Sequence, residues 1–367
     1  MIRAHKIRLY PNNVQATYFA KACGVARFAY NWALAKAKEQ YEQDSAAKFN
    51  EAALRKELNA IKREQFPWML EVTKCAPQLA IKDGLAKAFQ NFFAGRAEFP
   101  KFHKKGVRDS FSLSNDHLQI NGALVKVPNL GWVRLSEELR LNGKILGATI
   151  SRTADKWYIA IRVEMPDVLV PPSENQAVGV DLGIKALAIL SDGTQIVGSK
   201  ASRQCAKQLA RLNQSLSRKQ GAKKGETKSN NFLKAKKRLS RLYARMANIR
   251  SDETHKLTTM LTQNYGLIGI EDLNVKGMMS NHKLARSVAD MSFFEFRRQL
   301  EYKAETAGAT VVVAGMWFAS SKTCSSCGAK KDEFTLSERI YSCECGFVCD
   351  RDLNAAINLK NYALGRV

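Results

Sequence analysis

The segment Ala177-Val-Gly-Val-Asp-Leu-Gly-Ile184 opens the second half of the chain with an apolar run that ends at an acid, Asp181. A short apolar run bounded by turn residues indicates a buried β-strand. Residues 186–190 and 195–197 are also apolar, and the turn Ser191-Asp-Gly-Thr194 separates them. This spacing predicts a β-hairpin that continues directly from the first strand.

Two more apolar strands are expected further along the chain. Residues 267–272 read Leu-Ile-Gly-Ile-Glu-Asp, so this strand also ends in acids, and Glu271 is the first of them. A helix near residues 290–307 leads to a third buried strand at 309–314. A hairpin-rich start followed by alternating helices and strands predicts an α/β fold with a ribonuclease H-like sheet.

Acidic residues of this region predict a metal site. Asp181 and Glu271 directly follow buried strands, and Asp350-Arg-Asp352 opens a helix predicted for residues 352–359. Charged residues seldom follow a buried strand without a use, although any single one could be a helix cap or half of a surface ion pair. Clustered carboxylates repel one another unless cations neutralise them, and their hard oxygen atoms suit Mg²⁺ or Mn²⁺. Such a cluster is typical of two-metal hydrolysis of a phosphodiester.

Paired cysteines predict a structural zinc ribbon. Cys324-Ser-Ser-Cys327-Gly and Cys343-Glu-Cys345-Gly are two knuckles, and fifteen residues separate Cys327 from Cys343. The second knuckle is one residue shorter than usual, so Cys349 is an alternative fourth ligand. A redox pair or buried apolar cysteines are the other interpretations. The isolated cysteines are interpreted as small core residues: Cys23, Cys75 and Cys205.

The charge of the chain indicates a polyanionic partner. The 367 residues include 58 Lys and Arg against 34 Asp and Glu, a net charge of +24. Nucleic acid is the first candidate and an acidic membrane surface the second. The sequence has no run of about 18 apolar residues to span a bilayer, and its start lacks the apolar core of a signal peptide. We therefore expect a cytosolic protein.

More than half of the excess charge lies in residues 201–250, which hold fifteen Lys or Arg and a single acid, Glu226. Their apolar residues predict two helices, joined by a linker at 221–231, that meet along a narrow seam and have basic outer faces. Helices with charges of one sign are typical of phosphate binding, whereas an ordinary solvated face mixes both signs. The predicted seam residues are Leu209, Leu212, Leu216, Leu239, Leu242, Met246 and Ile249.

The first half of the chain predicts a small β-barrel interrupted by helices. Residues 2–10 alternate like a strand, and residues 13–93 have helical periodicity, with Asn50 as an N-cap. Residues 110–165 then show short strands between Gly and Asn turns, so we expect a barrel that the first strand completes. Residues 166–175 have the composition of a linker.

Three motifs resemble the RuvC motifs of the TnpB family, whose members are transposon-encoded, RNA-guided nucleases related to type V CRISPR effectors. They are Gly179-Val-Asp-Leu-Gly-Ile-Lys185, Ile270-Glu-Asp-Leu-Asn-Val-Lys-Gly-Met278 and Cys345-Gly-Phe-Val-Cys-Asp-Arg-Asp-Leu-Asn-Ala-Ala-Ile-Asn358. Residues 6–11 and 100–106 are also similar to this family, as is the zinc ribbon. The resemblance extends over nearly the whole chain.

This resemblance implies that Asp181, Glu271 and Asp352 form a magnesium-dependent catalytic triad. In the last motif the family's acid directly precedes the Leu-Asn-Ala-Ala run, which selects Asp352 and not Asp350. The resemblance also implies an oligonucleotide-binding-type wedge barrel with a helical recognition insertion. The expected domains are a wedge at 1–12 and 97–170, a recognition domain at 13–96, a RuvC nuclease at 171–319 with its basic hairpin at 201–250, a zinc ribbon at 320–349 and a RuvC C-terminal part at 350–367.

The resemblance further implies a noncoding guide RNA from the transposon end, a double-stranded DNA target and a short target-adjacent motif. Lys74 and Gln78 match, by their spacing, the pair that contacts this motif, and an ordinary exposed helix pair is the alternative. The protein would act in a prokaryotic cytoplasm, on the nucleoid when bound to DNA. We expect the nucleic-acid backbone to contact Lys101, Lys104, Lys105, Arg211, Arg218, Lys234, Lys237, Arg241 and Arg245.

Two other functions compete with an RNA-guided endonuclease. One is a guide-directed DNA-binding repressor that has lost cleavage; loss of a triad acid would indicate it, whereas here all three are present. The other is a RuvC-like resolvase or transposase that acts without RNA and has little need of a basic hairpin. The five histidines are scattered and match no second nuclease motif, so one RuvC site would cut both strands in turn.

Overall fold

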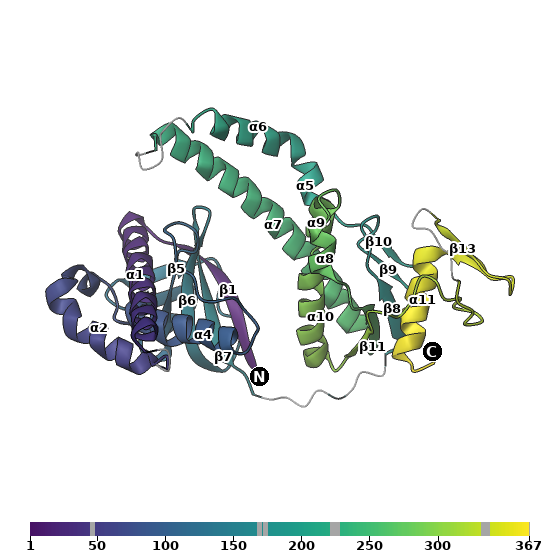
Figure 1. Cartoon of the computed structure of the whole chain (residues 1–367), viewed down its shortest axis with the longest axis horizontal. Helices are drawn as coiled ribbons and strands as arrows, with labels where there is room; N and C mark the ends of the chain where they lie inside the picture. Colours follow the sequence, from purple (N-terminus) through teal and green to yellow (C-terminus); the bar gives the residue numbers. More distant parts are fainter. Residues whose placement is uncertain (45–47, 167–170, 172–174, 221–227, 332–337, 367) are drawn as a thin grey trace. The chain divides into compact units, whose positions relative to one another are not determined.

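The computed structural model describes residues 1–44, 48–166, 171, 175–220, 228–331 and 338–366 (Figure 1). The chain divides into two compact units, Met1–Asp167 and Val168–Val367. Within the described residues, no helix has both the length and the apolar composition that crossing a bilayer requires.

Seven strands of the first unit form one antiparallel sheet in the order β2-β6-β7-β1-β5-β4-β3. They are β1 Ile2–Tyr10, β2 Ser110–Ser114, β3 Gln119–Asn121, β4 Leu124–Val127, β5 Gly131–Leu135, β6 Lys144–Thr153 and β7 Lys156–Glu164. As predicted, the first strand joins the later ones. It lies inside the sheet, where Ile2 to Leu9 pair with β7, and Leu9 and Tyr10 pair with β5.

The sheet of the first unit is strongly curled but is not a closed barrel. The edge strands β2 and β3 follow each other in the chain, and the link from Ser114 to Gln119 spans at most about 19 Å. A flat sheet of seven strands would place its edges about 29 Å apart, so the sheet must bend to bring them together. Among the described residues no ladder joins β2 to β3. The barrel prediction is therefore right about curvature and wrong about hydrogen-bonded closure.

The predicted helical segment contains α1 Asn13–Gln43, α2 Glu51–Gln65, α3 Cys75–Leu79 and α4 Ala86–Phe93. A capping box begins α1: the Asn12 side chain accepts a hydrogen bond from the Gln15 amide at 2.8 Å, and the Gln15 side chain accepts one from the Asn12 amide at 3.1 Å. Asn50 caps α2, as predicted, by accepting from the Ala53 amide at 3.1 Å.

Helices and sheet of the first unit share one hydrophobic core. Phe19 of α1 is fully buried, and its ring centre lies 5.2 Å from that of Trp157 and 6.0 Å from that of Phe111, both in the sheet. Cys23 and Cys75 belong to the same core, which confirms their interpretation as small buried residues. The helical segment is thus packed onto the sheet into which it is inserted.

The second unit contains a five-stranded mixed sheet in the order β10-β9-β8-β11-β12. Its strands are β8 Ala177–Asp181, β9 Ala188–Leu190, β10 Gln195–Ile196, β11 Leu267–Glu271 and β12 Thr310–Ala314, and a separate pair is β13 Ile340–Ser342 and β14 Val348–Asp350. Its helices are α5 Ala201–Gln204, α6 Ala206–Ser217, α7 Asn230–Asn264, α8 Val275–Ser280, α9 Ala285–Met291, α10 Phe293–Ala307 and α11 Arg351–Ala363.

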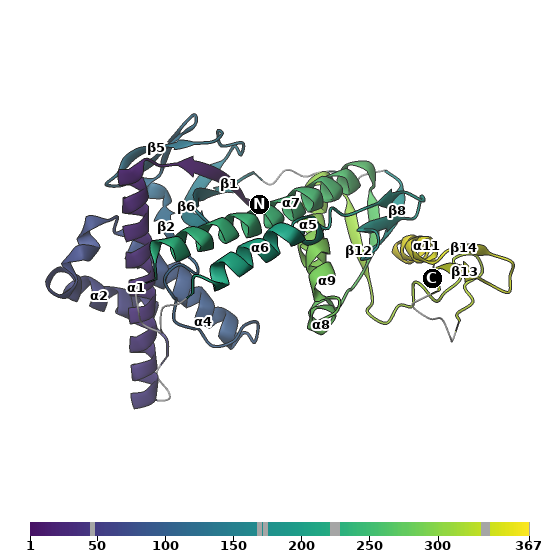
Figure 2. The ribbon, with the colours of Figure 1, turned by 90° about the horizontal axis from the view of Figure 1, so that it is seen from above.

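The strand directions in this sheet agree with the predicted hairpin and parallel strands. β9 runs antiparallel to both β8 and β10, whereas β11 runs parallel to both β8 and β12. Helices α7 and α10 lie on one side of the sheet and α11 on the other (Figure 1 and Figure 2). The helix expected near 290–307 is divided at Ser292, whose φ of 55° separates α9 from α10.

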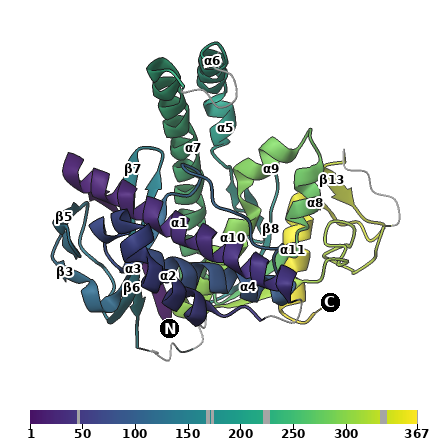
Figure 3. The same cartoon turned by 60° about the vertical axis from the view of Figure 1, so that its left-hand side comes forward.

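The basic segment forms the predicted helical hairpin, in which α6 and α7 lie side by side (Figure 3). Leu242 and Met246 are buried in the seam together with Cys205, and Leu209, Leu212 and Ile249 pack against them. Residues 221–227 of the expected linker lie outside the described residues. The second helix continues to Asn264, beyond the predicted end at 250, because Leu257 and Leu261 extend its buried stripe into the core of the sheet.

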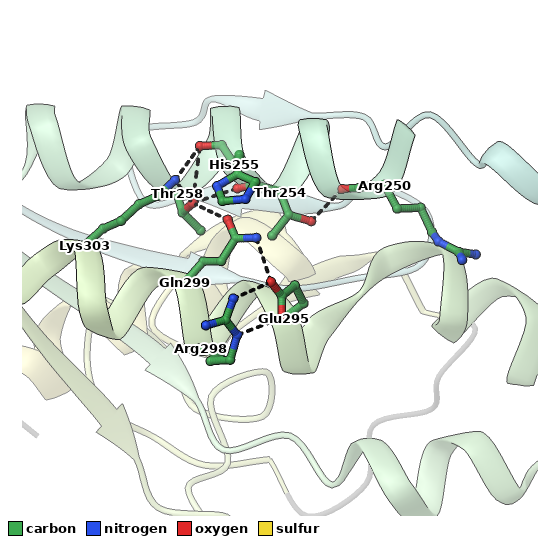
Figure 4. Close-up of polar contacts among 8 residues, drawn as sticks. All are labelled: Arg250, Thr254, His255, Thr258, Glu295, Arg298, Gln299 and Lys303. Carbon is green, nitrogen blue, oxygen red and sulfur yellow. Dashed lines mark hydrogen bonds and ion pairs between the residues drawn. The ribbon is translucent and has the colours of Figure 1, made fainter. Parts of the chain in front are cut away.

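A polar network holds α10 against α7 (Figure 4). The Lys303 ammonium donates to the carbonyl oxygen of His255 and to the hydroxyl of Thr258, both at 2.7 Å, and burial lowers its pKa to about 8. The Thr258 hydroxyl donates to the fully buried Gln299 at 3.2 Å, and Gln299 donates to Glu295 at 2.9 Å. Buried polar groups are costly unless paired, so this network fixes how the two helices meet.

Candidate active site and zinc-binding cluster

The geometry of the candidate site begins with two glycines. Gly179 of β8 and Gly269 of β11 are partners in register in neighbouring parallel strands. A Cβ atom on Gly179 would lie 1.9 Å from the carbonyl oxygen of Ala356, and one on Gly269 would lie 2.2 Å from that of Leu359. The backbone of α11 therefore rests directly on the backbone of both strands, which only glycine at these positions permits.

This packing decides which face the predicted catalytic acids occupy. Side chains two residues apart on a strand point to the same face, and Asp181 and Glu271 each lie two residues after one of these glycines. Both acids therefore project on the face that α11 covers. Asp352 lies in the first turn of α11, so three segments that are distant in sequence bring their acids to one edge of the sheet.

Asp181 has an unusual electrostatic environment. Burial raises its pKa to about 8, and the negative charges of Glu271 and Asp352 act in the same direction, against a smaller opposing effect of Arg351. The three carboxylates are thus close enough to repel one another. A group in which the charged form is disfavoured in this way gains from a nearby cation, which would relieve the repulsion.

Glu271 and Asp352 have partners from the chain itself. Glu271 accepts a hydrogen bond from the hydroxyl of Ser320. Asp352 accepts one from Nε of Arg351 at 3.1 Å and lies 3.7 Å from the guanidinium of Arg339. The ligand oxygens of these three acids do not all lie within 4.8 Å of one another. Among the described residues, only one group of potential metal ligands is that compact, and it consists of four cysteines.

The neighbouring acids Asp350 and Asp272 have other structural roles. Asp350 caps α11, because its carboxylate accepts from the amides of Asp352 at 2.9 Å and Leu353 at 3.2 Å. Asp272 forms an ion pair of 2.6 Å with Arg297. These contacts give Asp350 the role of a helix cap and Asp272 that of an ion-pair partner.

The cysteine knuckles of the sequence meet in one cluster. Its members are Cys324, Cys327, Cys343 and Cys345. The sulfur atoms of Cys324 and Cys345 lie 3.7 Å apart, and those of Cys327 and Cys343 lie 3.6 Å apart. Four thiols at such distances can hold a zinc ion in tetrahedral geometry. The short second knuckle therefore supplies both of its cysteines to the cluster.

Cys349, the alternative fourth ligand, is outside this cluster. Its thiol donates instead to the carbonyl oxygen of Asp350 at 3.2 Å. Within the cluster, burial opposes ionisation of Cys324. Hydrogen bonds from the backbone of Cys327 and Ser326 and from the thiols of Cys327 and Cys343 together outweigh burial and lower its pKa to about 7. A thiol that ionises near neutral pH is well suited to bind a metal, because the thiolate is the ligand form.

Two buried asparagines attach the cysteine-bearing segment to α11. Asn354 donates to the carbonyl oxygen of Thr323 at 2.7 Å and accepts from the amide of Ser325 at 3.0 Å. Asn358 donates to the carbonyl oxygens of Ser320 at 2.7 Å and Thr323 at 2.6 Å. The ribbon thus adjoins the helix that carries Asp352. The sequence interpretation did not identify this role of the asparagines. The pattern that indicates it is two amide side chains one turn apart on an otherwise apolar helix face.

The residues predicted to read a target-adjacent motif share one turn of helix. Lys74 immediately precedes α3, and the amide of Gln78 lies 3.5 Å from its carbonyl oxygen. Lys74 is exposed and lines a hollow of about 320 Å³ together with Lys62 and Asn129. Burial lowers the pKa of Lys62, and the charges of Arg63 and Lys74 add to this effect. The hollow is therefore positively charged beside Lys74.

The residues predicted to contact the nucleic-acid backbone are all exposed. Lys101 forms an ion pair of 2.5 Å with Glu98, and Lys104 and Lys105 lie in the same segment. The hairpin residues lie outside its seam on α6 and α7: Arg211, Arg218, Lys234, Lys237, Arg241 and Arg245. This accessibility is what phosphate contacts need, and their role stays a prediction.

Three family models match the chain. Residues 160–282 match IS605 OrfB, described as "Probable transposase", and residues 293–359 match "Cas12f1-like, TNB domain". Residues 1–45, which form β1 and α1, match a "Helix-turn-helix domain". The first match contains Asp181 and Glu271, and the second contains the four clustered cysteines and Asp352.

Relatives match over almost the full chain. A "Putative RNA-guided DNA endonuclease" of Streptomyces pristinaespiralis is 35% identical over 97% of this chain and 88% of the relative. The chain belongs to the TnpB/IS605 OrfB family. Another relative of this TnpB chain, "Putative RNA-guided DNA endonuclease InsQ" of Escherichia coli K12, is 33% identical over 98% of this chain and 91% of the relative.

The fold of this TnpB chain also occurs in a solved structure, "Cryo-EM structure of the Cas12f1-sgRNA-target DNA complex". The match has a TM-score of 0.57 and covers 95% of this chain and 83% of that one. The two sequences are 14% identical, so the likeness concerns the fold.

Proposed function

We propose that this TnpB-family chain is an RNA-guided DNA endonuclease of a transposable element. The observation that carries the proposal is the convergence of Asp181, Glu271 and Asp352. Burial, together with the charges of the other two acids, raises the pKa of Asp181 to about 8. The names of the relatives from Streptomyces and Escherichia coli support it. The sheet on which the acids lie would be a RuvC domain of the ribonuclease H-like type, and the chain would also contain the other parts expected from the sequence, from wedge to zinc ribbon.

The donor set at the candidate site fits Mg²⁺ or Mn²⁺, because all three side chains offer hard carboxylate oxygens. When bound, two such ions supply an activated water and stabilise the leaving 3′ oxygen. Burial and the charges of Glu271 and Asp352 raise the pKa of Asp181, so a bound cation would favour its ionised form. Arg351 and Arg339 neutralise Asp352 in the metal-free protein, and Ser320 holds Glu271 in place.

The remaining predicted residues would contact different parts of the nucleic acid. Pairing with the guide RNA supplies sequence specificity, while the protein reads a short adjacent motif and the charge of the backbone. Lys74 and Gln78 would contact the adjacent motif of the double-stranded target. The exposed basic residues at 101–105 and along α6 and α7 would hold phosphates without reading sequence.

The decisive experiment purifies the protein with its cellular RNA and sequences that RNA. One abundant species ending in variable sequence is expected, and DNA complementary to that end should be cut in the presence of Mg²⁺. Glu271→Gln should abolish cutting, whereas the matched control Asp272→Asn, whose carboxylate pairs with Arg297, should retain it.

Three outcomes would overturn the proposal. Random cellular RNA in the preparation would exclude a dedicated guide. Sequence-specific cutting after complete removal of RNA would favour a resolvase or transposase. Guide-directed binding without cutting by the wild-type protein would favour a repressor.

A further inference from the structure

A cavity of about 600 Å³ lies in the second unit. The loop after β8, the start of α5, helix α9 and the segment before β13 line it. Five cationic side chains contribute to the lining: Lys185, Lys200, Arg203, Arg286 and Arg339. Four of them, all except Lys200, are exposed residues, so the positive charge is accessible from solvent.

The acid that lines this cavity, Asp290, does not offset these charges. It is 6% exposed, and its carboxylate accepts hydrogen bonds from the amide and the hydroxyl of Ser202. It also forms an ion pair of 3.3 Å with Arg250, which already balances its charge. The cavity therefore keeps a net positive charge.

Three of the five cations have no partner within the part of the chain that the structure describes. The side chains of Lys185, Arg203 and Arg286 make no hydrogen bond or ion pair there. Lys200 donates to the carbonyl oxygen of Lys185 at 3.2 Å, a neutral acceptor that supplies no counter-ion. Like charges gathered without counter-ions repel one another, and a polyanion would relieve that repulsion.

The position of the cavity points to the identity of the anion. Arg339 lies 3.7 Å from Asp352, and Lys185 follows Asp181 by four residues. The cavity thus adjoins Asp352 through Arg339, which lines it. Its other lining side chains are aliphatic, hydroxyl or thioether groups with no aromatic ring on which a base could stack. Contacts here would go to phosphates and would carry no sequence information.

We propose that this cavity binds the sugar–phosphate backbone of the DNA strand that is to be cut and holds it against the three acids. Lys185, Arg203 and Arg286 are the positioning residues. The inference rests on the proposed nuclease function and adds to it a specific strand-binding site, because none of the backbone contacts predicted from the sequence lies in this cavity.

The test uses the RNA-bound Asp181→Asn protein, which keeps the DNA intact, and a single-stranded oligodeoxynucleotide as the probe. Lysines are acetylated with and without the oligonucleotide, and modification is measured by mass spectrometry. Acetylation of Lys185 should fall severalfold on binding, and high salt should restore it. Lys256, which lies on α7 in an ion pair with Asp252, should react equally in both samples.

Two double variants test whether the protection of Lys185 depends on the cavity. Arg203→Gln with Arg286→Gln should remove the protection of Lys185 and reduce the slope of log affinity against log salt by about 1.4, because each single-strand phosphate contact contributes about 0.7. Lys256→Gln with Arg366→Gln removes the same charge from surfaces outside the cavity and should preserve the protection.

The outcomes separate this inference from the proposed function. Unchanged acetylation of Lys185 while the oligonucleotide is bound overturns the cavity assignment, even if the wild-type protein cuts DNA. Protection of Lys185 in the variant, combined with a wild-type protein that cuts no DNA, overturns the nuclease function and leaves the strand site. Stronger protection by an RNA oligonucleotide of the same sequence overturns the assignment to DNA.

Discussion

Gly179 and Gly269 face each other in register on neighbouring parallel strands, and the backbone of α11 crosses both of them. This relationship explains why acids from three distant segments meet. The glycines let the helix approach the sheet closely, and each lies two residues before an acid on the same face of its strand. The close approach brings the first turn of α11, with Asp352, to the strand ends that carry Asp181 and Glu271.

Alanine at either glycine should destabilise the second unit and reduce cutting. A Cβ at Gly179 would meet backbone atoms that cannot move aside, and overpacking of this kind costs about 1–3 kcal/mol or more. Urea unfolding and cleavage rate measure the two effects. Gly315→Ala is the matched control, because a Cβ there meets nothing within 4 Å. Equal loss of stability in the Gly315 variant would contradict this reasoning.

Stability in the absence of magnesium should fall as pH rises from about 4 to about 8. An aspartate in an unfolded chain has a pKa of about 3.9, whereas burial and the charges of Glu271 and Asp352 raise the pKa of Asp181 to about 8. Between these values the folded protein holds a proton that the unfolded chain has released, so rising pH favours unfolding.

Asp181→Asn removes this ionisation and tests its effect on stability. The free energy of unfolding of the variant should exceed that of the wild type by a margin that grows across this pH range. Urea titrations in magnesium-free buffer measure both proteins. Parallel curves would show that Asp181 ionises normally.

Zinc content should depend on Cys345 and not on Cys349. Cys345 lies 3.7 Å from Cys324 within the four-thiol cluster, whereas Cys349 donates to a backbone carbonyl outside it. Elemental analysis of the purified variants should find zinc retained in Cys349→Ser and strongly reduced in Cys345→Ser. The reverse result would make Cys349 the fourth ligand.

Asn358→Ala should loosen the segment that leads into the zinc cluster. It leaves the carbonyl oxygen of Ser320 without this donor, whereas that of Thr323 keeps the hydrogen bond from Asn354. A buried polar group left unpaired costs about 1–3 kcal/mol. Amide hydrogen exchange of residues 320–325 should become faster. Asn361→Ala, a change on the same helix outside this network, should leave the exchange rates unchanged, and faster exchange in that variant would mean that the helix itself is disturbed.

The sequence by itself determined the features that are local patterns. Asn50 was recognisable as a cap because a cap acts within one turn, and the seam around Leu242 and Met246 followed from helical periodicity. Asp181 and Glu271 stood out because each ends an apolar run. The knuckles at Cys324 and Cys343 were also visible as local patterns, because the two cysteines of each knuckle are close together in the sequence.

Only the tertiary structure decided the features that join distant segments. It showed that β2 and β3 do not pair in the described sheet, that Cys345 joins the cluster without Cys349, and that Arg339 reaches Asp352 beside a cationic cavity. Contacts of this kind depend on how helices and strands pack, and packing combines small contributions from residues far apart in the chain. Gly179 and Gly269 illustrate the difference: each is an ordinary glycine in its own strand, and its importance arises only where α11 crosses the sheet.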